Sequence, residues 1–190
     1  IAAMSASQAA AFEAADKAVM STEQLAALAA TPIVLDLNGD GVHTTAAAQG
    51  VNFDLDGNGM VQKVGWVDTT DGLLALDRNA DGLINNGTEL FGSATQTATG
   101  AATDGFAAMA SMDSNHDGSL SNLDLNFDKL KLWVDADHDG ISDAGELKLL
   151  SDYNIASIDL AAQAGTVSDN GNFLGLTSSY TTTDGSQHAV

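Results

Sequence analysis

From residue 33 onward, the chain alternates short apolar runs with stretches rich in glycine and aspartate. Runs of about four to eight residues with apolar side chains at every second position are typical of strands. The pattern therefore predicts strands within 51–56, 60–68, 72–77, 155–162, 172–183 and 186–190. We expect the last two to be joined by a turn at Asp184-Gly185, a dipeptide that favours tight hairpins.

The first 30 residues have a different pattern, rich in alanine and poor in charge. Alanine has the highest helix propensity, so residues 5–20 and 21–30 are each predicted to form a helix. Ser21 and Gln24 have the spacing of a capping box at the start of the second helix. Pro32 ends it, because the residue before a proline is pushed out of the helical region.

Two further helices are predicted in the remainder of the chain. One lies within 104–112 and is capped by Asp104, and the other lies within 144–154. Residues 122–134 begin with a helical pattern and end with strand-like alternation, and the pattern leaves both interpretations open.

Together these elements predict an α+β fold in which loops similar to those of EF-hands join short strands and helices. Two regions are predicted: an alanine-rich helical segment over 1–31 and a domain over 32–190. A length of 190 residues is enough for one domain of ordinary size with an accessory segment.

One motif recurs five times, an apolar residue followed by Asp-x-Asp/Asn-x-Asp/Asn-Gly. The copies begin at Asp36, Asp54, Asp77, Asp113 and Asp135, and their unequal spacing argues against a solenoid. A twelve-residue calcium loop supplies oxygen ligands from positions 1, 3 and 5, the position 7 carbonyl, position 9 and a carboxylate at 12, with glycine at 6 for the sharp turn. The motif therefore predicts calcium loops.

Two loops match this pattern along their whole length. The loop from Asp135 predicts the ligands Asp135, Asp137, Asp139, the Ile141 carbonyl, Asp143 and Glu146. The loop from Asp113 ends in a shorter acid, which tends to give one oxygen in place of two. Its predicted ligands are Asp113, Asn115, Asp117, the Ser119 carbonyl, Ser121 and Asp124.

The loop from Asp77 deviates by one residue, because its acid falls at position 13. A bulge at Gly87 would absorb the extra residue. The predicted ligands of this loop are Asp77, Asn79, Asp81, the Leu83 carbonyl, Asn85 and Glu89.

The two remaining loops have the start of the motif and no closing acid, since position 12 is Ala47 in one and Gly65 in the other. Either they bind calcium with ligands from elsewhere, Asp68 or Asp71, or they are solvated acidic turns. The ligands that their own sequences predict are Asp36, Asn38, Asp40, Asp54, Asp56 and Asn58.

The charge balance agrees with a cation ligand. The net charge is −20, and 15 of the 26 acids fall at the predicted ligand positions. Without metal these carboxylates repel one another, and with calcium they contribute to folding. Such a chain also repels phosphate backbones and anionic membrane surfaces, so nucleic acid is a poor partner. No run of 18 apolar residues predicts a membrane span.

The sequence contains none of the common motifs for other catalytic or cofactor sites. The chain has no cysteine and no P-loop, GxGxxG, HExxH or GxSxG motif. His116 and His138 fall at position 4 of their loops and are expected to be spectators, and no catalytic role is expected for His43 or His188.

With the loops in order, the chain resembles the self-processing module of FrpC-type RTX proteins. The segments that carry the resemblance are "PIVLDLNGDGV", "NFDLDGNGM", "GWVDTTDGLLALDRNADGLINNGTELFG", "LDLNFDKLKLWVDADHDGISDAGEL" and "IASIDL". The resemblance runs from Pro32 to the C-terminus. It implies type I secretion of an unfolded chain and folding in extracellular calcium. We expect a monomeric module that meets other proteins through its parent chain.

The resemblance also implies an activity. In such modules calcium-induced folding cleaves an Asp-Pro bond at the N-terminal edge, and a lysine amine can capture the new aspartyl group as an isopeptide. An aspartate carboxyl group can attack its own peptide carbonyl to form a cyclic anhydride, with the proline nitrogen as leaving group. Because proline has no N–H, closure to a succinimide is blocked, and the fold supplies only positioning and protonation.

Here the sequence departs from the family, because the bond is Thr31-Pro32 and Pro32 is the only proline in the chain. A threonine hydroxyl cannot form the anhydride, so Thr31 and Pro32 mark the position of the scissile bond without its nucleophile. Two hypotheses remain: a calcium-dependent structural module without the activity, or an autocatalytic peptidase and ligase in an inactive form. A dockerin-like partner binder is a third, which the additional strands and loops disfavour.

Overall fold

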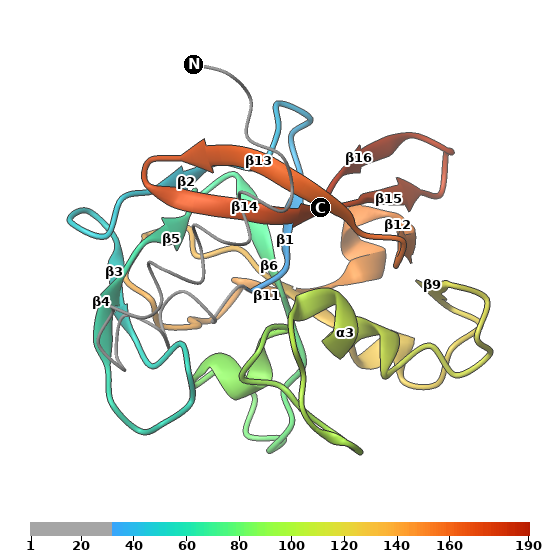
Figure 1. Cartoon of the computed structure of the whole chain (residues 1–190), viewed down its shortest axis with the longest axis horizontal. Coiled ribbons are helices and arrows are strands. Elements are labelled where there is room, and N and C mark those ends of the chain that lie inside the picture. Colours follow the sequence, from blue (N-terminus) through green and yellow to red (C-terminus); the bar gives the residue numbers. More distant parts are fainter. Residues whose placement is uncertain (1–31) are drawn as a thin grey trace, which may run out of the picture.

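The computed structural model describes residues 32–190 (Figure 1). The helices predicted within the first 30 residues, and Thr31, lie outside the described residues. No helix of the described part is long and apolar enough to cross a membrane.

The described residues form a mainly β structure, so the predicted α+β class is wrong. The strands are short and antiparallel. They are β1 (Val34–Asp36), β2 (Thr44–Thr45), β3 (Val51–Phe53), β4 (Gln62–Val64), β5 (Trp66–Val67), β6 (Asp71–Ala75), β7 (Gln96–Thr97), β8 (Gly100–Ala101), β9 (Ser119–Ser121), β10 (Lys131–Trp133), β11 (Leu147–Leu149), β12 (Ile155–Asp159), β13 (Gln163–Asp169), β14 (Asn172–Thr177), β15 (Ser179–Thr182) and β16 (Gln187–Ala189).

Helical structure in this part is limited to one α-helix and three 3-10 turns. These are α3 (Gly105–Ala110), η1 (Gly87–Glu89), η2 (Phe127–Lys129) and η3 (Leu150–Tyr153). The prediction for α3 is confirmed, because the Asp104 side chain accepts a hydrogen bond from the Ala107 N–H at 2.8 Å.

The helix predicted within 144–154 is absent. Its first half forms β11, in which Leu147 pairs with Trp133 of β10. Its second half forms η3, which ends at Asn154 in a left-handed conformation with φ of 56°. Helix propensities differ by about 1 kcal/mol or less per residue, and pairing with a buried strand outweighs them here. Residues 122–134 resolve likewise into η2 and strand β10.

The central sheet has the strand order β1-β6-β10-β11 and separates two hydrophobic cores. All five residues of β6 are buried because both faces of the sheet are covered. Leu74 contributes to the larger core and Leu73 to the smaller one, as expected for neighbours that point to opposite faces.

The smaller core contains an aromatic cluster of Phe53, Trp66 and Trp133, whose ring centroids lie 5.0–5.6 Å apart. Such tilted and edge-on contacts contribute about 0.5–1.5 kcal/mol each beyond the area that they bury. Because Trp133 belongs to β10 and Trp66 to β5, the cluster fastens the small sheets to the central one.

The second sheet has the strand order β16-β15-β12-β9 and closes the larger core. The predicted turn at Asp184-Gly185 joins β15 to β16, with Gly185 at φ of 87°. The long hairpin β13–β14 crosses one side of the molecule (Figure 1). Its tip is held by Asp169, whose carboxylate accepts hydrogen bonds from the Thr44 N–H at 2.6 Å and the Thr44 hydroxyl at 2.8 Å.

Candidate metal centre

The five acidic loops share two left-handed positions. In each, positions 4 and 6 are left-handed, and position 6 is always glycine, which adopts this conformation without strain. The residues are Gly39 and Gly41, Gly57 and Gly59, Ala80 and Gly82, His116 and Gly118, and His138 and Gly140. The shared conformation is why the motif places its glycine at position 6.

The aspartate at position 1 organises each loop. In the loop from Asp135, its carboxylate accepts hydrogen bonds from the N–H groups of Asp139 at 3.1 Å and Gly140 at 2.9 Å. The loops from Asp54, Asp77 and Asp113 repeat this pair of contacts. In the loop from Asp36 the donors are Gly39 at 2.7 Å and Gly41 at 3.0 Å.

A closing carboxylate completes three loops in the same way. Glu146 accepts hydrogen bonds from the position 2 N–H of Ala136 at 2.8 Å and the position 9 N–H of Asp143 at 3.1 Å. Asp124 accepts from the corresponding groups of its loop, Ser114 at 2.8 Å and Ser121 at 2.9 Å. Burial opposes ionisation of Asp124, but these N–H groups outweigh it and lower its pKa.

Glu89 performs the same role from position 13. It accepts hydrogen bonds from the position 2 N–H of Arg78 at 3.1 Å and the position 9 N–H of Asn85 at 2.9 Å. The extra residue is absorbed by η1, as the bulge predicted at Gly87 requires. A Cβ at Gly87 would lie 1.7 Å from the Leu55 carbonyl oxygen, so only glycine fits this turn against the preceding loop.

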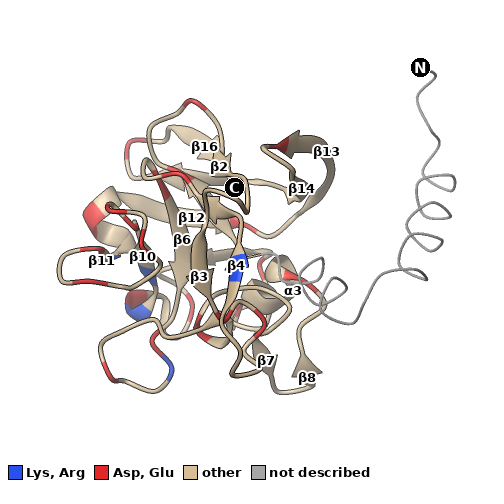
Figure 2. Ribbon diagram, turned by 90° about the vertical axis from the view of Figure 1, so that its left-hand side faces the viewer, with Lys and Arg blue, Asp and Glu red and all other residues tan. Residues whose placement is uncertain are grey.

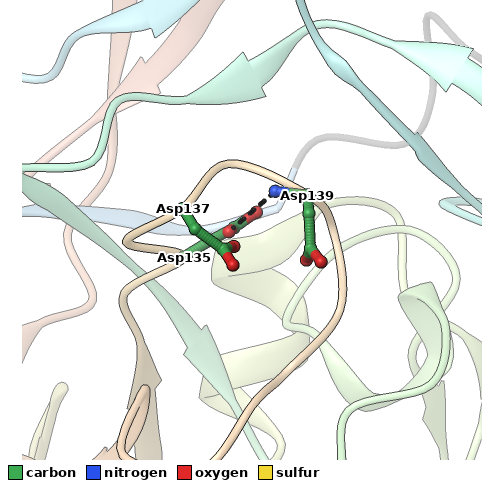
Figure 3. A group of neighbouring side chains, drawn as sticks. All are labelled: Asp135, Asp137 and Asp139. Carbon is green, nitrogen blue, oxygen red and sulfur yellow. Dashed lines mark hydrogen bonds between the residues drawn. The ribbon is translucent and has the colours of Figure 1, made fainter.

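The loop from Asp135 brings together the tightest group of carboxylates in the described chain. Asp135, Asp137 and Asp139 each place an oxygen within 4.8 Å of the others, and their side chains converge in Figure 3. Desolvation and the neighbouring carboxylates raise the pKa of Asp137. Convergent carboxylate oxygens are the donor set of a hard divalent cation, so these residues fit calcium.

Both tryptophans donate to this loop, a contact that the sequence analysis did not predict. The Trp66 indole N–H lies 2.7 Å from the Asp135 carboxylate, and the Trp133 indole N–H lies 3.2 Å from that of Glu146. The first and last acids of the loop are therefore tied to the aromatic cluster of the smaller core.

The loops from Asp77 and Asp135 are joined at their eighth positions. The Ile84 N–H donates to the Ser142 hydroxyl at 2.7 Å, and both residues are buried. Because Ile84 belongs to one loop and Ser142 to the other, a buried hydrogen bond connects the two loops.

The two loops without a closing acid differ from each other. Asp68, one of the two residues predicted to complete them, instead accepts from the Thr70 N–H in its own turn at 3.3 Å. Asp71, the other, is fully buried and accepts from the His43 N–H in the loop from Asp36 at 2.8 Å. The structure therefore brings Asp71 to the loop from Asp36 and brings neither acid to the loop from Asp54.

No lysine or arginine of the described chain forms an ion pair with the acids of the loops. Figure 2 shows the acidic residues spread over the loops and few basic ones near them. Among the described residues the one ion pair is between His43 and Asp40, with 3.5 Å between nitrogen and oxygen. The imidazole of His138, which was predicted to be a spectator, lies 3.1 Å from the Thr45 hydroxyl. Within the described chain, this imidazole forms no hydrogen bond with a carboxylate. Little of the negative charge of the loops is therefore compensated within the described chain.

Backbone hydrogen bonds hold the residues that follow Thr31. The buried Ile33 donates its N–H to the Phe91 carbonyl at 2.9 Å, and its carbonyl accepts from the Leu74 N–H at 2.9 Å. Pro32 lines a cavity of about 570 Å³ together with Phe106, Phe173 and other residues of α3, β14 and the C-terminus.

Comparison with known proteins identifies relatives of the chain. Residues 33–190 match the family model of the SPM domain. The chain is also similar to the iron-regulated protein FrpA of Neisseria meningitidis serogroup C, with 45% identity over 158 residues. That match covers 81% of this chain and 14% of FrpA, so the chain spans about one seventh of this relative's length.

Proposed function

Since the chain belongs to the SPM domain family, the self-processing modules of iron-regulated RTX-type proteins, we propose that it is a module whose folding is driven by calcium. The observation that carries this proposal is the common construction of three loops. In each, the closing carboxylate accepts from the N–H groups of positions 2 and 9 although the loops differ in sequence and in the position of that acid.

The residues that would hold the ions are those of the predicted pattern. The loops from Asp77, Asp113 and Asp135 would each supply carboxylate and amide oxygens, one backbone carbonyl and a closing acid. Bound calcium would supply positive charge, and the carboxylate, amide and carbonyl oxygens of the loops would coordinate it. The chain's own N–H groups hold the carboxylates in place, and the two indoles connect the loop from Asp135 to the core.

Charge explains why folding would depend on the ion. Fifteen acids lie at predicted ligand positions, and no lysine or arginine of the described chain pairs with them. Without a cation, folding would bring these carboxylates together with no compensation, whereas ion binding adds its free energy to folding. Extracellular calcium modules bind at roughly 10⁻⁴ to 10⁻³ M, so a secreted chain would fold only outside the cell.

Circular dichroism tests this proposal. We expect an unfolded spectrum in chelator and a β-sheet spectrum in millimolar calcium, with magnesium at the same concentration as the control for ionic strength. Magnesium demands a smaller, near-octahedral site and should not substitute at equal concentration. A β-sheet spectrum that is equal in chelator and in calcium would contradict the proposal.

For the natural chain we propose no cleavage at Thr31-Pro32, because threonine lacks the carboxyl group that would form the anhydride. A second candidate function is that of an autocatalytic peptidase and ligase lacking only its nucleophile. The observation that favours it is the anchoring of Ile33 by two backbone hydrogen bonds, which fixes the chain beside the leaving nitrogen of Pro32.

The Thr31→Asp variant separates these two candidates. Purified in chelator and then given calcium, it should release a fragment beginning at Pro32 if the scaffold is catalytically intact, as read by intact mass. The Thr31→Ala variant is the matched control, because it changes the same residue without supplying a carboxyl group. A Thr31→Asp chain that folds and stays whole would rule out the peptidase candidate and leave the structural module.

A further inference from the structure

Asp71 is a buried acid whose hydrogen bonding is incomplete. It lies at the start of β6 with an exposed fraction of 0%. Its Oδ1 has no hydrogen-bond partner among the described residues. A buried carboxylate oxygen without a partner is unfavourable, so its presence calls for a ligand.

The surroundings of Asp71 identify where that ligand would lie. Asp71 is the direct partner of Asp36 in the antiparallel pair β1–β6. Its Oδ2 accepts from the N–H of His43, position 8 of the loop from Asp36. The backbone of Leu37, position 2 of that loop, also lies at this carboxylate.

This arrangement is similar to that of the closing acids in the other loops, with position 8 in the place of position 9. Glu146, Asp124 and Glu89 each bind the N–H groups of positions 2 and 9. Asp71 lies on a different strand, 35 residues after Asp36 in the sequence. Its carboxylate lies at positions 2 and 8 of the loop from Asp36. The loop from Asp36 lacks a closing carboxylate in its own sequence, and Asp71 places one beside it.

The electrostatics of the site call for positive charge. Asp71 lies directly across from Asp36 in the strand pair and feels the charge of Asp40, so three carboxylates act on one another here. His43 lies beside Asp40 at the solvent-facing side of the loop, and no lysine or arginine pairs with these acids in the described chain.

We propose that Asp71 closes a calcium site on the loop from Asp36, with Asp36, Asn38 and Asp40 as its other side-chain ligands. The site rests on the proposed calcium-dependent function and adds to it a fourth ion with a ligand from a neighbouring strand. Its donors are carboxylate and amide oxygens, the set that calcium prefers. The unpartnered Oδ1 of Asp71 is then a ligand atom.

The position of the site gives it a specific consequence. Asp36 lies in β1, four residues after Pro32, and its carbonyl accepts from the buried Tyr180 hydroxyl at 2.6 Å. Tyr180 of β15 stacks on His188 of β16, with 5.0 Å between ring centroids. An ion at Asp36 and Asp71 would therefore fasten the N-terminal edge of the domain to β6 and to the C-terminal strands.

Counting bound ions tests the proposal. Native mass spectrometry of the calcium-loaded chain should show one ion fewer for Asp71→Asn than for the natural sequence. The matched control is Asp68→Asn, the same change three residues away in an acid that only caps its own turn, and it should keep the full number. An equal number of ions in Asp71→Asn would overturn the site.

A second variant keeps the test decisive if Asp71→Asn does not fold. Asp40 has a side chain that is 58% exposed, so Asp40→Ala should fold, and it should bind one ion at least tenfold more weakly. Unchanged affinity at every site in Asp40→Ala would overturn the proposal. Measurements on the unsubstituted chain distinguish failure of this site from failure of the proposed function. If the unsubstituted chain binds no calcium, the proposed function is wrong. If it binds calcium as tightly as both variants do, only the proposed site at Asp71 is wrong.

Discussion

Replacement of Glu146 by glutamine is the sharpest perturbation of a single loop. Glu146 Oε1 accepts from the Ala136 N–H at 2.8 Å, and Oε2 accepts from the Asp143 N–H at 3.1 Å and the Trp133 indole at 3.2 Å. A glutamine side chain has one acceptor oxygen, and its other terminal atom is an NH₂ group. This NH₂ group would face a backbone N–H, and two donors cannot form a hydrogen bond. At best the glutamine variant loses one charged hydrogen bond and weakens two others.

The expected loss follows from these contacts. Hydrogen bonds to charged groups contribute about 1.5–3 kcal/mol and neutral ones about 0.5–1.5 kcal/mol, so the calcium-loaded fold should lose about 3 kcal/mol. That loss lowers the folding equilibrium constant roughly 100-fold. If folding takes up three or four ions together, the calcium midpoint rises by about the cube or fourth root of this factor, roughly three- to fivefold.

A calcium titration followed by far-UV circular dichroism measures this midpoint in chelator-buffered solutions. The matched control is Asp128→Asn, which makes the same change of charge at an exposed acid outside the loops. If Glu146→Gln folds at the same calcium concentration as Asp128→Asn, the closing carboxylate does not have the role that its contacts indicate.

Three further substitutions test the supporting contacts. Ser142→Ala leaves the buried Ile84 N–H without its acceptor and should lower the free energy of unfolding in calcium by about 1–3 kcal/mol, measured by urea denaturation; no change would contradict the coupling of the two loops. Asp169→Ala should speed amide hydrogen exchange at Thr44, because it removes the acceptor of that N–H; unchanged exchange would show that the hairpin tip is held otherwise. Gly87→Ala should prevent or strongly weaken folding, since its Cβ overlaps a backbone carbonyl, and native-like stability would refute the tight turn.

The sequence was sufficient for features that depend on neighbouring residues. The motif predicts five loops of one kind, and all five have the same left-handed positions. The Asp104 cap and the turn at Asp184-Gly185 follow from local chemistry and are confirmed. The bulge at Gly87 was also predictable, because the count from Asp77 to Glu89 exceeds the pattern by one.

Features that depend on distant residues were missed or wrong. The stretch 144–154 has good helix formers, yet Leu147 pairs with Trp133, and strand pairing of this kind cannot be read from local propensity. The register that sets Asp71 opposite Asp36 is likewise a property of the sheet. From the sequence, Asp68 and Asp71 were equal candidates, and burial distinguishes them.

Small-angle X-ray scattering of the natural chain in chelator and in millimolar calcium tests the proposed calcium-driven folding most directly. A chain of 190 residues has a radius of gyration of about 47 Å when unfolded and about 16 Å when compact. We expect a value near the first in chelator and a collapse toward the second on addition of calcium, reversed by renewed chelation. A compact chain of equal radius in both solutions would contradict the account.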